Sequence, residues 1–327
     1  MLSRRNLIKT GLSIPMLAPM LGASNHVLAA PEKFSISLAQ WSLHRTYYGE
    51  HAQKGYGHLF KLLQSDPAAA VSTGPDPMDF PILARNEFGI GAVEYVNQFY
   101  FAQIDNESYF KEMAQKAADH GVVSHLMMLD GTGPIGATDP TVSAVARENV
   151  KRWMGQAQIL GCSMVRVNAE GEGEWHERAK RTADALDQLA VLGESMDLAV
   201  VVENHGGLSS NGAWLAEVMS LASHPGVGTL PDFGNFRTGK DEAGDDIWYD
   251  RYQGVRELMP FAKAVSAKSY DFDESGNDTA TDYQKMMKIV LDAGYTGYVG
   301  IEYEGRGLSE YDGIRATKRL LESIQAN

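Results

Sequence analysis

Short apolar runs alternate with longer amphipathic stretches along the chain after residue 31. The run AVVVE at 199–203 places β-favouring residues in succession, which is typical of a strand buried on both faces. Similar runs predict eight strands, at residues 35–42, 91–97, 122–129, 163–168, 198–204, 227–233, 264–270 and 297–303.

The stretches between these runs carry apolar residues at helical spacing. Residues 139–161 begin with Asp-Pro and end at Gly, as helices often do. The predicted helices are 107–121, 139–161, 177–195, 211–223, 245–259, 281–294 and 310–324. Eight strands alternating with helices, at roughly 35 residues a pair, indicate an α/β fold that is a single (β/α)8 TIM barrel. A doubly wound open sheet is the alternative, but no GxGxxG follows the first strand.

One connection of this predicted barrel is unusually long. Residues 44–80 lie between the first strand and the next helix and are rich in Tyr, His and Gly. In a barrel this β1–α1 loop lies at the carboxyl ends of the strands, where active sites are built. We expect a lid or binding loop there, with a passive insertion as the alternative.

The first thirty residues have the character of an export signal. Arg4 and Arg5 precede a modest apolar stretch that Pro15 and Pro19 interrupt, and VLAA then offers small residues for cleavage. The stretch is too short and too broken to span a membrane. SRRNLIK resembles the twin-arginine export motif, which implies a folded, periplasmic protein with no stable membrane anchor after cleavage. We therefore expect a signal peptide at 1–30 and the barrel at 31–327.

Charge narrows the choice of partners. The net charge is −13, and removing Arg4, Arg5 and Lys9 with the signal takes it to −16. A chain this acidic is repelled by nucleic acid backbones, so DNA or RNA is not an expected partner. Cys162 is the one cysteine, which excludes an intramolecular disulfide and CxxC zinc motifs.

Acidic residues end three of the predicted strands. Glu203 ends the fifth strand, Asp232 the sixth and Glu302 the eighth. Strand ends of a barrel converge on one mouth, and crowded carboxylates raise one another's pKa unless a cation compensates. Oxygen ligands of this kind suit Mg²⁺, Mn²⁺ or a similar divalent ion. We predict that Glu203, Asp232 and Glu302 are metal ligands, with solvated strand ends as the alternative.

Further polar residues are expected at the same mouth. Ser266 and Lys268 share one face of the seventh strand by period two. The substrate-binding candidates are His205, Asn235, Glu94, His125, Asn168 and Trp41. Trp41, with Tyr47 and Tyr48, is a candidate for stacking on a sugar ring, although aromatic residues there pack in the core equally often.

The segments VENHGG, PDFGNF, AKSYDFD and GIEYEG, in this order, resemble the xylose-isomerase-like barrels of the sugar phosphate isomerase/epimerase group. The resemblance covers nearly all of residues 34–325. It implies a divalent metal (Mn, Mg, Co or Zn) bound by Glu, Asp, His and Glu from strands five to eight, and the first, second and last map onto Glu203, Asp232 and Glu302.

The chain departs from the family pattern at two positions. The usual His-x-Lys-Asp of strand seven reads Ser266-Ala267-Lys268-Ser269, and the usual Asp-x-x-His of strand six ends at Asn235. His205, Asn235 or water are candidates for the remaining ligand positions, and a weakly held or absent metal is the alternative.

The resemblance also implies the chemistry. In such enzymes one carboxylate removes a proton beside a carbonyl, the metal stabilises the enediolate, and a second carboxylate returns the proton. Glu203 and Glu302 are the implied catalytic pair, and Lys268 is expected to contact a substrate oxygen.

We therefore expect an exported sugar isomerase or epimerase. A lyase that acts on 3-keto-glycosides from the same first step, and a non-catalytic carbohydrate-binding barrel, are the alternatives. The superfamily also includes a zinc-dependent abasic-site endonuclease, but the charge, the export signal and the missing imidazoles argue against DNA repair. The expected partner is a small sugar or keto-sugar, and the oligomeric state stays open, a homo-oligomer included.

Overall fold

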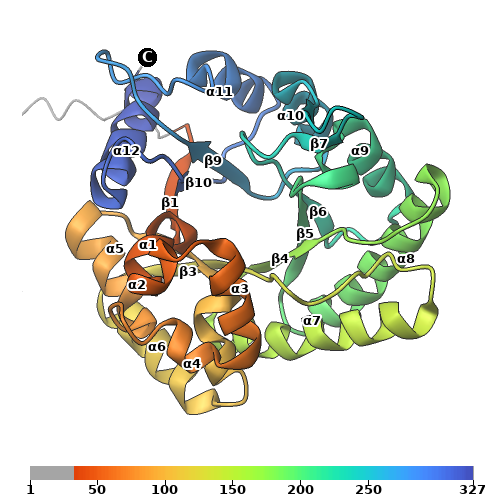
Figure 1. The fold of residues 1–327 in the computed structure, drawn as a ribbon, viewed down its shortest axis with the longest axis horizontal. Coiled ribbons are helices and arrows are strands. Elements are labelled where there is room, and N and C mark those ends of the chain that lie inside the picture. The colour runs from red at the N-terminus through yellow and green to blue at the C-terminus, as the bar shows by residue number, and fades with distance from the viewer. Residues whose placement is uncertain (1–32, 327) are drawn as a thin grey trace, which may run out of the picture. The chain divides into compact units, whose positions relative to one another are not determined.

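Eight parallel strands form the centre of the fold, and helices surround them (Figure 1). The computed structural model describes residues 33–326, so the predicted export signal lies outside the described residues. The barrel strands are β1 (Ser35–Ala39), β2 (Ala92–Val96), β3 (Val123–Met128), β4 (Met164–Asn168), β5 (Ala199–Glu203), β6 (Val227–Leu230), β9 (Val265–Ser269) and β10 (Tyr298–Tyr303). Each predicted strand overlaps one of these, which confirms the (β/α)8 barrel.

The strands pair in chain order, and the ring closes between β6 and β9, which are the two ends of the hydrogen-bonded ladder. The hydrogen-bonded order is β6-β5-β4-β3-β2-β1-β10-β9. Beyond β6 the ladder is interrupted at Pro231, which has no backbone N–H to donate. Closure comes instead from single parallel bridges, Thr229 with Ala262 and Asp232 with Ser266. This irregular closure carries Asp232 past the end of its strand and sets it beside β9.

Helices cover the outside of the barrel. They are α5 (Phe80–Phe88), α6 (Glu107–Asp119), α7 (Pro140–Leu160), α8 (Trp175–Glu194), α9 (Gly212–Leu221), α10 (Arg251–Leu258), α11 (Tyr283–Asp292) and α12 (Glu310–Ala326). Five of these helices begin with a residue whose side-chain oxygen accepts a backbone N–H of the first turn. The five capping residues are Asn106, Asp139, Asn211, Asp250 and Asp282. Such caps fix where each helix begins, because the first-turn N–H groups have no partner within the helix.

The β1–α5 connection is long, as predicted, but it is largely helical. It contains η1 (Gln40–Leu43), α1 (His44–Tyr48), α2 (Glu50–Gln53), α3 (Tyr56–Ser65), α4 (Pro67–Ala70) and η2 (Pro77–Asp79). The remaining 3-10 turns are η3 (Asn97–Gln103), η4 (Gly207–Ser210) and η5 (Met259–Phe261). Tyr47 and Tyr48 are fully buried, so they pack in the core and do not face a ligand.

The helix predicted at 245–259 is wrong in its first part. Residues Arg237–Lys240 (β7) and Asp246–Trp248 (β8) form an antiparallel hairpin, and α10 begins only at Arg251. The turn is stabilised by Asp241, whose Oδ1 accepts the N–H groups of Ala243 and Asp245. A local turn and the β-favouring pair Ile247-Trp248 outweigh the helical spacing there. Among residues 33–326, no helix combines the length and apolarity needed to cross a bilayer.

Candidate active site

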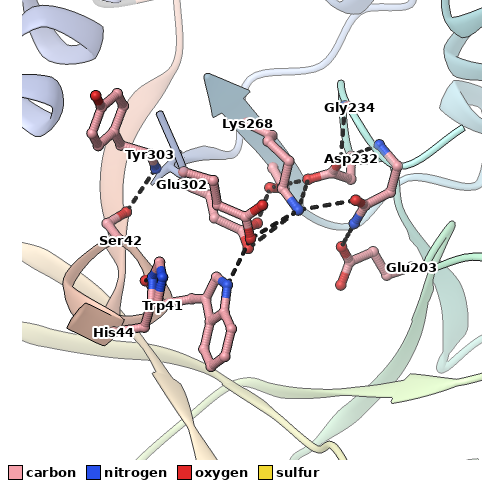
Figure 2. Close-up of polar contacts among 12 residues, drawn as sticks. Trp41, Ser42, His44, Glu203, Asp232, Gly234, Lys268, Glu302 and Tyr303 are labelled. Carbon is pink, nitrogen blue, oxygen red and sulfur yellow. Dashed lines mark hydrogen bonds and ion pairs between the residues drawn. The ribbon is translucent and has the colours of Figure 1, made fainter. Parts of the chain in front are cut away.

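Three acidic side chains meet at the carboxyl ends of the barrel strands. Glu203 is the last residue of β5, Asp232 follows β6 by two residues, and Glu302 lies near the end of β10. Figure 2 shows them turned toward a common centre, with Lys268 among them. One carboxylate oxygen from each lies within 4.8 Å of the other two, and all three residues are buried. The structure therefore brings together the acids that the sequence pattern grouped.

Asp232 is held rigidly by the chain around it. Its Oδ1 accepts the backbone N–H groups of Gly234 (2.8 Å) and Asn235 (2.7 Å). Its Oδ2 accepts the Ser266 hydroxyl at 2.7 Å. Burial raises the pKa of Asp232 above its usual range, although the Lys268 ammonium opposes the shift. The two backbone bonds orient this carboxylate without help from any ligand.

Ser266 bridges two of the acids. Its hydroxyl oxygen lies 2.7 Å from Oδ2 of Asp232 and 2.8 Å from Oε2 of Glu302. A hydroxyl carries one hydrogen, so it can donate to only one of two carboxylates at a time. Burial raises the pKa of Glu302 and the Lys268 ammonium lowers it. Burial has the larger effect, and the pKa of Glu302 is about 7. The pair therefore needs either a shared proton or a cation.

Lys268 supplies one positive charge. Its Nζ donates to Oδ1 of Asn235 at 3.0 Å and lies 3.5 Å from carboxylate oxygens of both Glu302 and Glu304. Burial disfavours the ammonium, but Asp232, Glu302 and Glu304 outweigh burial and raise the pKa of Lys268 well above its usual value. Lys268 is thus a charged donor, 3% exposed, at the centre of the acids.

Arg166 supplies the second positive charge, and the sequence analysis missed it. Its Nε lies 2.9 Å from Oε2 of Glu203, and its Nη1 donates to Oδ1 of Asp130 at 2.6 Å. The contact with Glu203 is an ion pair whose atoms are not aligned as a hydrogen bond. The signal was present in MVRVN, where a charged residue interrupts an apolar strand two positions before Asn168.

Asp130 and Asn168 complete the surroundings of Arg166. Asn168 donates to Oδ1 of Asp130 at 2.9 Å and accepts from Arg166 at 3.0 Å, so its amide is fully engaged in this network. Burial works against ionisation of Asp130, but the Arg166 guanidinium, the nearby His205 imidazole and the hydrogen bonds from Arg166 and Asn168 together outweigh burial and lower the pKa of Asp130 to about 2. Asn168, which was predicted to bind substrate, thus orients the ion pair of Arg166 and Asp130 next to Glu203.

Trp41 and Glu304 form the side of the site next to the β1–α5 connection. The indole Nε1 of Trp41 donates to Oε1 of Glu304 at 2.6 Å. Glu304 is partly exposed, and the Lys268 ammonium outweighs the effect of desolvation and lowers the pKa of Glu304 below the usual range. The sequence analysis gave Glu304 no role, because a residue past a strand end has no position fixed by strand period.

The remaining candidates lie in different places. Asn235 is central, since its Nδ2 also donates to Oε1 of Glu203 at 2.8 Å. His205 is an exposed residue two positions after Glu203. Among residues 33–326 its backbone N–H donates to the Ser209 hydroxyl, and its side chain has no hydrogen-bond partner. Glu94 is fully buried in the barrel interior, where it accepts the Ser37 hydroxyl at 2.6 Å and burial raises its pKa to about 8. A Cβ on Gly300 would lie 2.4 Å from the Glu94 carboxylate, so this glycine makes room for it.

His125 does not reach the mouth. It is the third residue of β3, with Ser163 at the start of the neighbouring strand 3.3 Å from its Nδ1 and its ring tilted against Tyr298, the first residue of β10. These neighbours place it toward the amino-terminal ends of the strands. The sequence analysis expected His125 at the strand end, but Leu126, Met127 and Met128 continue the strand beyond it.

The acid cluster fits a divalent cation. Lys268 and Arg166 bring two positive charges to five carboxylates, those of Asp130, Glu203, Asp232, Glu302 and Glu304. A negative excess remains if all five ionise, and within the described part of the chain Oε2 of Glu203 accepts no hydrogen bond. Buried carboxylate oxygens with spare lone pairs are the donors that hard divalent ions prefer.

Fold and site together define the class of protein: a (β/α)8 barrel whose mouth holds a buried carboxylate cluster able to bind a cation. Residues 83–326 match the xylose isomerase-like TIM barrel family, and the chain belongs to that family.

Two solved structures illustrate the shared fold. A 3-keto-D-glucoside 4-epimerase from E. coli has a TM-score of 0.58 at 14% identity, covering 76% of this chain and 94% of that one. A xylose isomerase-like TIM barrel protein from Mycobacterium smegmatis, in complex with magnesium, has a TM-score of 0.60 at 14% identity, covering 90% of this chain and 97% of that one. At such identities the likeness concerns the fold alone.

A closer sequence match is confined to a short segment. The C-glycoside deglycosidase alpha subunit of Arthrobacter globiformis is 38% identical over 66 residues. The segment is 19% of this chain and 19% of that protein, so the chain matches about a fifth of this relative's length.

Proposed function

We propose that this protein is a metal-assisted isomerase or epimerase that moves a proton at a carbon beside the carbonyl of a sugar or keto-sugar. The observation that carries the proposal is the arrangement of Glu203 and Glu302 around one centre, with the Lys268 ammonium between them as a charged donor. Family membership supports a sugar substrate, because the family is named for a sugar isomerase.

The proton transfer uses two carboxylates of this site. One takes the proton from the carbon, the electron pair of the broken C–H bond forms a C=C bond, and the π pair of the carbonyl moves onto its oxygen. The other carboxyl group returns a proton to the opposite face of the same carbon in an epimerisation. In an isomerisation the proton returns to the former carbonyl carbon, and the hydroxyl proton of the neighbouring carbon moves to the former carbonyl oxygen. Glu302 suits this role because its carboxylate lies at the common centre of the acids, 3.5 Å from Nζ of Lys268.

Lys268 stabilises the negative charge that develops on the substrate oxygen. Its N–H groups are already oriented by Asn235 and neighbouring acids, so little reorganisation is needed during the reaction. Glu203, Asp232 and Glu302 would hold the divalent cation, whose charge, when it is bound, stabilises the same developing oxyanion. Arg166 and Asn235 position the Glu203 carboxylate from two sides.

We further propose that the protein acts in the periplasm after twin-arginine export, on free sugars or glycosides. The basis is the amino-terminal sequence SRRNLIK followed by an interrupted apolar stretch. Phosphorylated sugars are mostly cytoplasmic, which favours unphosphorylated substrates for an exported enzyme.

The test is deuterium uptake from heavy water into a panel of free sugars and 3-keto-glycosides, with Mn²⁺ or with a chelator. We expect metal-dependent exchange at one carbon beside the carbonyl. Glu302→Gln should lower the exchange rate about 10²–10⁴-fold, as loss of a general acid–base group does. The exposed Glu112→Gln serves as the control. Absence of exchange from every sugar of the panel, or exchange that Glu302→Gln leaves intact, would overturn the proposal.

A second candidate is elimination from a 3-keto-glycoside, in which removal of the proton beside the carbonyl is followed by departure of the glycosidic substituent. The match to part of a deglycosidase alpha subunit favours it. It predicts that the same panel releases the substituent at the rate of proton loss, whereas an epimerase or isomerase exchanges the proton and leaves the glycosidic bond intact. A carbohydrate-binding barrel without activity would bind sugars and catalyse neither reaction.

A further inference from the structure

A cavity of about 990 Å³ lies beside the acid cluster, and the proton transfer leaves it unused. Its walls come from the β1–α5 connection, through His44 and Tyr56, and from the segments after β9 and β10, through Asp271, Glu304 and Arg306. Glu304 belongs to both places, because its Oε1 lies 3.5 Å from Nζ of Lys268. Of the five carboxylates of the acid cluster, Glu304 is the one that lines the cavity, so this side chain links the two places.

One wall of the cavity is an aromatic surface. The Tyr56 side chain is 44% exposed, and its hydroxyl donates to Nε2 of His44 at 3.1 Å. His44 bonds the Trp41 carbonyl through Nδ1 at 2.8 Å, and its ring stacks on Trp41 with centroids 4.8 Å apart. Tyr56 is therefore fixed in orientation by a stack that ends at Trp41 and Glu304.

The opposite wall is polar. Among residues 33–326 the guanidinium of Arg306 has no hydrogen-bond or ion-pair partner, so its donors are free for a ligand. Asp271 adds an acceptor on this wall, and Gln53 adds an amide from the β1–α5 connection. Pockets for drug-like ligands are lined predominantly by apolar groups and have volumes of about 300–1,000 Å³. This cavity reaches the top of that range but mixes one aromatic face with many polar groups.

That mixture matches the chemistry of a sugar ring, which has an apolar C–H face and a rim of hydroxyl groups. The acid cluster accommodates the ring that reacts, and the cavity begins where that ring would end. We propose that the cavity binds a second sugar residue, joined by a glycosidic bond to the reacting one, so that the substrate is a disaccharide or a longer saccharide. This inference rests on the proposed function for the first ring.

The test is equilibrium binding by calorimetry, which needs no turnover. The ligands are cellobiose, maltose, lactose and trehalose, compared with their constituent monosaccharides, methyl β-D-glucoside and 4-nitrophenyl β-D-glucoside. We expect at least one disaccharide to bind about tenfold or more tightly than its monosaccharides. Tyr56→Ala should weaken that disaccharide about 2- to 12-fold, the range of an aromatic contact, and leave monosaccharides unchanged.

Trp248→Ala is the control, because Trp248 on β8 is an aromatic residue that is 56% exposed and does not line the cavity. Tyr56→Phe keeps the ring and should retain the disaccharide preference. The inference is overturned if no disaccharide is preferred, if Tyr56→Ala weakens both ligand classes equally, or if the nitrophenyl glycoside binds more tightly than every disaccharide. If a disaccharide binds preferentially but no sugar shows proton exchange, the proposed function is wrong and the second sugar site remains supported.

Discussion

Arg166 lies beneath Glu203, with its Nε 2.9 Å from Oε2 of the carboxylate, and both side chains are almost completely buried. The same guanidinium binds Asp130, so a single charge on β4 is shared by an acid of the site and an acid that follows β3. A buried ion pair of this kind contributes little net stability. Removing one partner is nevertheless strongly destabilising, because it leaves the other charge buried without compensation.

We therefore predict that Arg166→Met destabilises the protein by about 3–5 kcal/mol, because Glu203 and Asp130 lose their shared partner. Urea unfolding at neutral pH measures the change. Arg152→Met is the control, since Arg152 pairs with Asp105 at 2.8 Å on the surface, where an ion pair contributes about 1 kcal/mol or less. Equal effects of the two substitutions would contradict the role assigned to burial.

Export gives a second prediction. Replacing Arg4 and Arg5 together by Lys should leave the precursor in the cytoplasm, because the twin-arginine route reads the arginine pair and not charge alone. Fractionation of cells that produce either form measures it, with Lys9→Arg as a variant that leaves the pair intact. Unchanged periplasmic recovery of the double variant would refute this route.

The barrel could be predicted from the sequence because its strands are apolar runs of regular spacing and its helices have recognisable starts and ends. The acids could be predicted for the same reason, since Glu203 and Glu302 terminate such runs and a barrel brings strand ends together. The hairpin at Arg237–Trp248 could not, because its stability depends on a local turn at Asp241 that competes with a helical pattern.

The neighbours of the acids were harder to predict than the acids themselves. Arg166 lies in β4, and Asp130 lies two residues after the end of β3. Only the closed barrel brings Arg166 beside Glu203 and Asp130 beside Arg166. Period two gives the face of a side chain but not its height within the barrel. For this reason His125 was expected at the mouth, although it lies near the opposite end.

Glu94 gives a prediction about pH. Burial raises its pKa from 4.5 to about 8, so the folded state holds a proton that the unfolded chain loses above about pH 4.5. Below that pH both states hold the proton, so Glu94 does not change the free energy of unfolding with pH. As the pH rises from 4.5 toward 8, the unfolded chain loses the proton more readily, and the free energy of unfolding falls. Glu94→Gln, which keeps an oxygen for the Ser37 hydroxyl, should stabilise the protein by on the order of 3 kcal/mol at pH 8 and by little at pH 4.

Urea unfolding at the two pH values tests this expectation, with the exposed Glu148→Gln as the control. A gain in stability that is the same at pH 4 and pH 8 would show that Glu94 is not protonated in the folded state at neutral pH.

The metal ligands can be tested without measuring activity. Glu203→Gln, Asp232→Asn and Glu302→Gln should each weaken Mn²⁺ binding about tenfold or more, because each replaces an anionic oxygen donor by a neutral one. Lys268→Met should retain or strengthen Mn²⁺ binding, since it removes a positive charge 3.5 Å from Glu302. Electron paramagnetic resonance titration of Mn²⁺ provides the affinities. A protein that binds no Mn²⁺, Co²⁺ or Zn²⁺ in any form would invalidate the ligand assignment.

Ser266→His is the sharpest probe of the same site. The Ser266 hydroxyl touches both Asp232 and Glu302, so an imidazole built from this position reaches the centre of the acids and adds a nitrogen donor. We expect tighter binding of Co²⁺ or Zn²⁺, which accept imidazole readily, and a smaller gain for Mg²⁺. Ser266→Ala removes the bridge without adding a donor, so it should not produce this selectivity.

Because Ser266 is buried, the larger histidine side chain should lower the free energy of unfolding by about 1–3 kcal/mol. Unfolding measurements on both variants separate this cost from the effect on metal binding. A folded Ser266→His variant whose Co²⁺ and Zn²⁺ affinities equal those of Ser266→Ala would show that position 266 does not face the metal, and the role given to Lys268 two residues later would then lose its support.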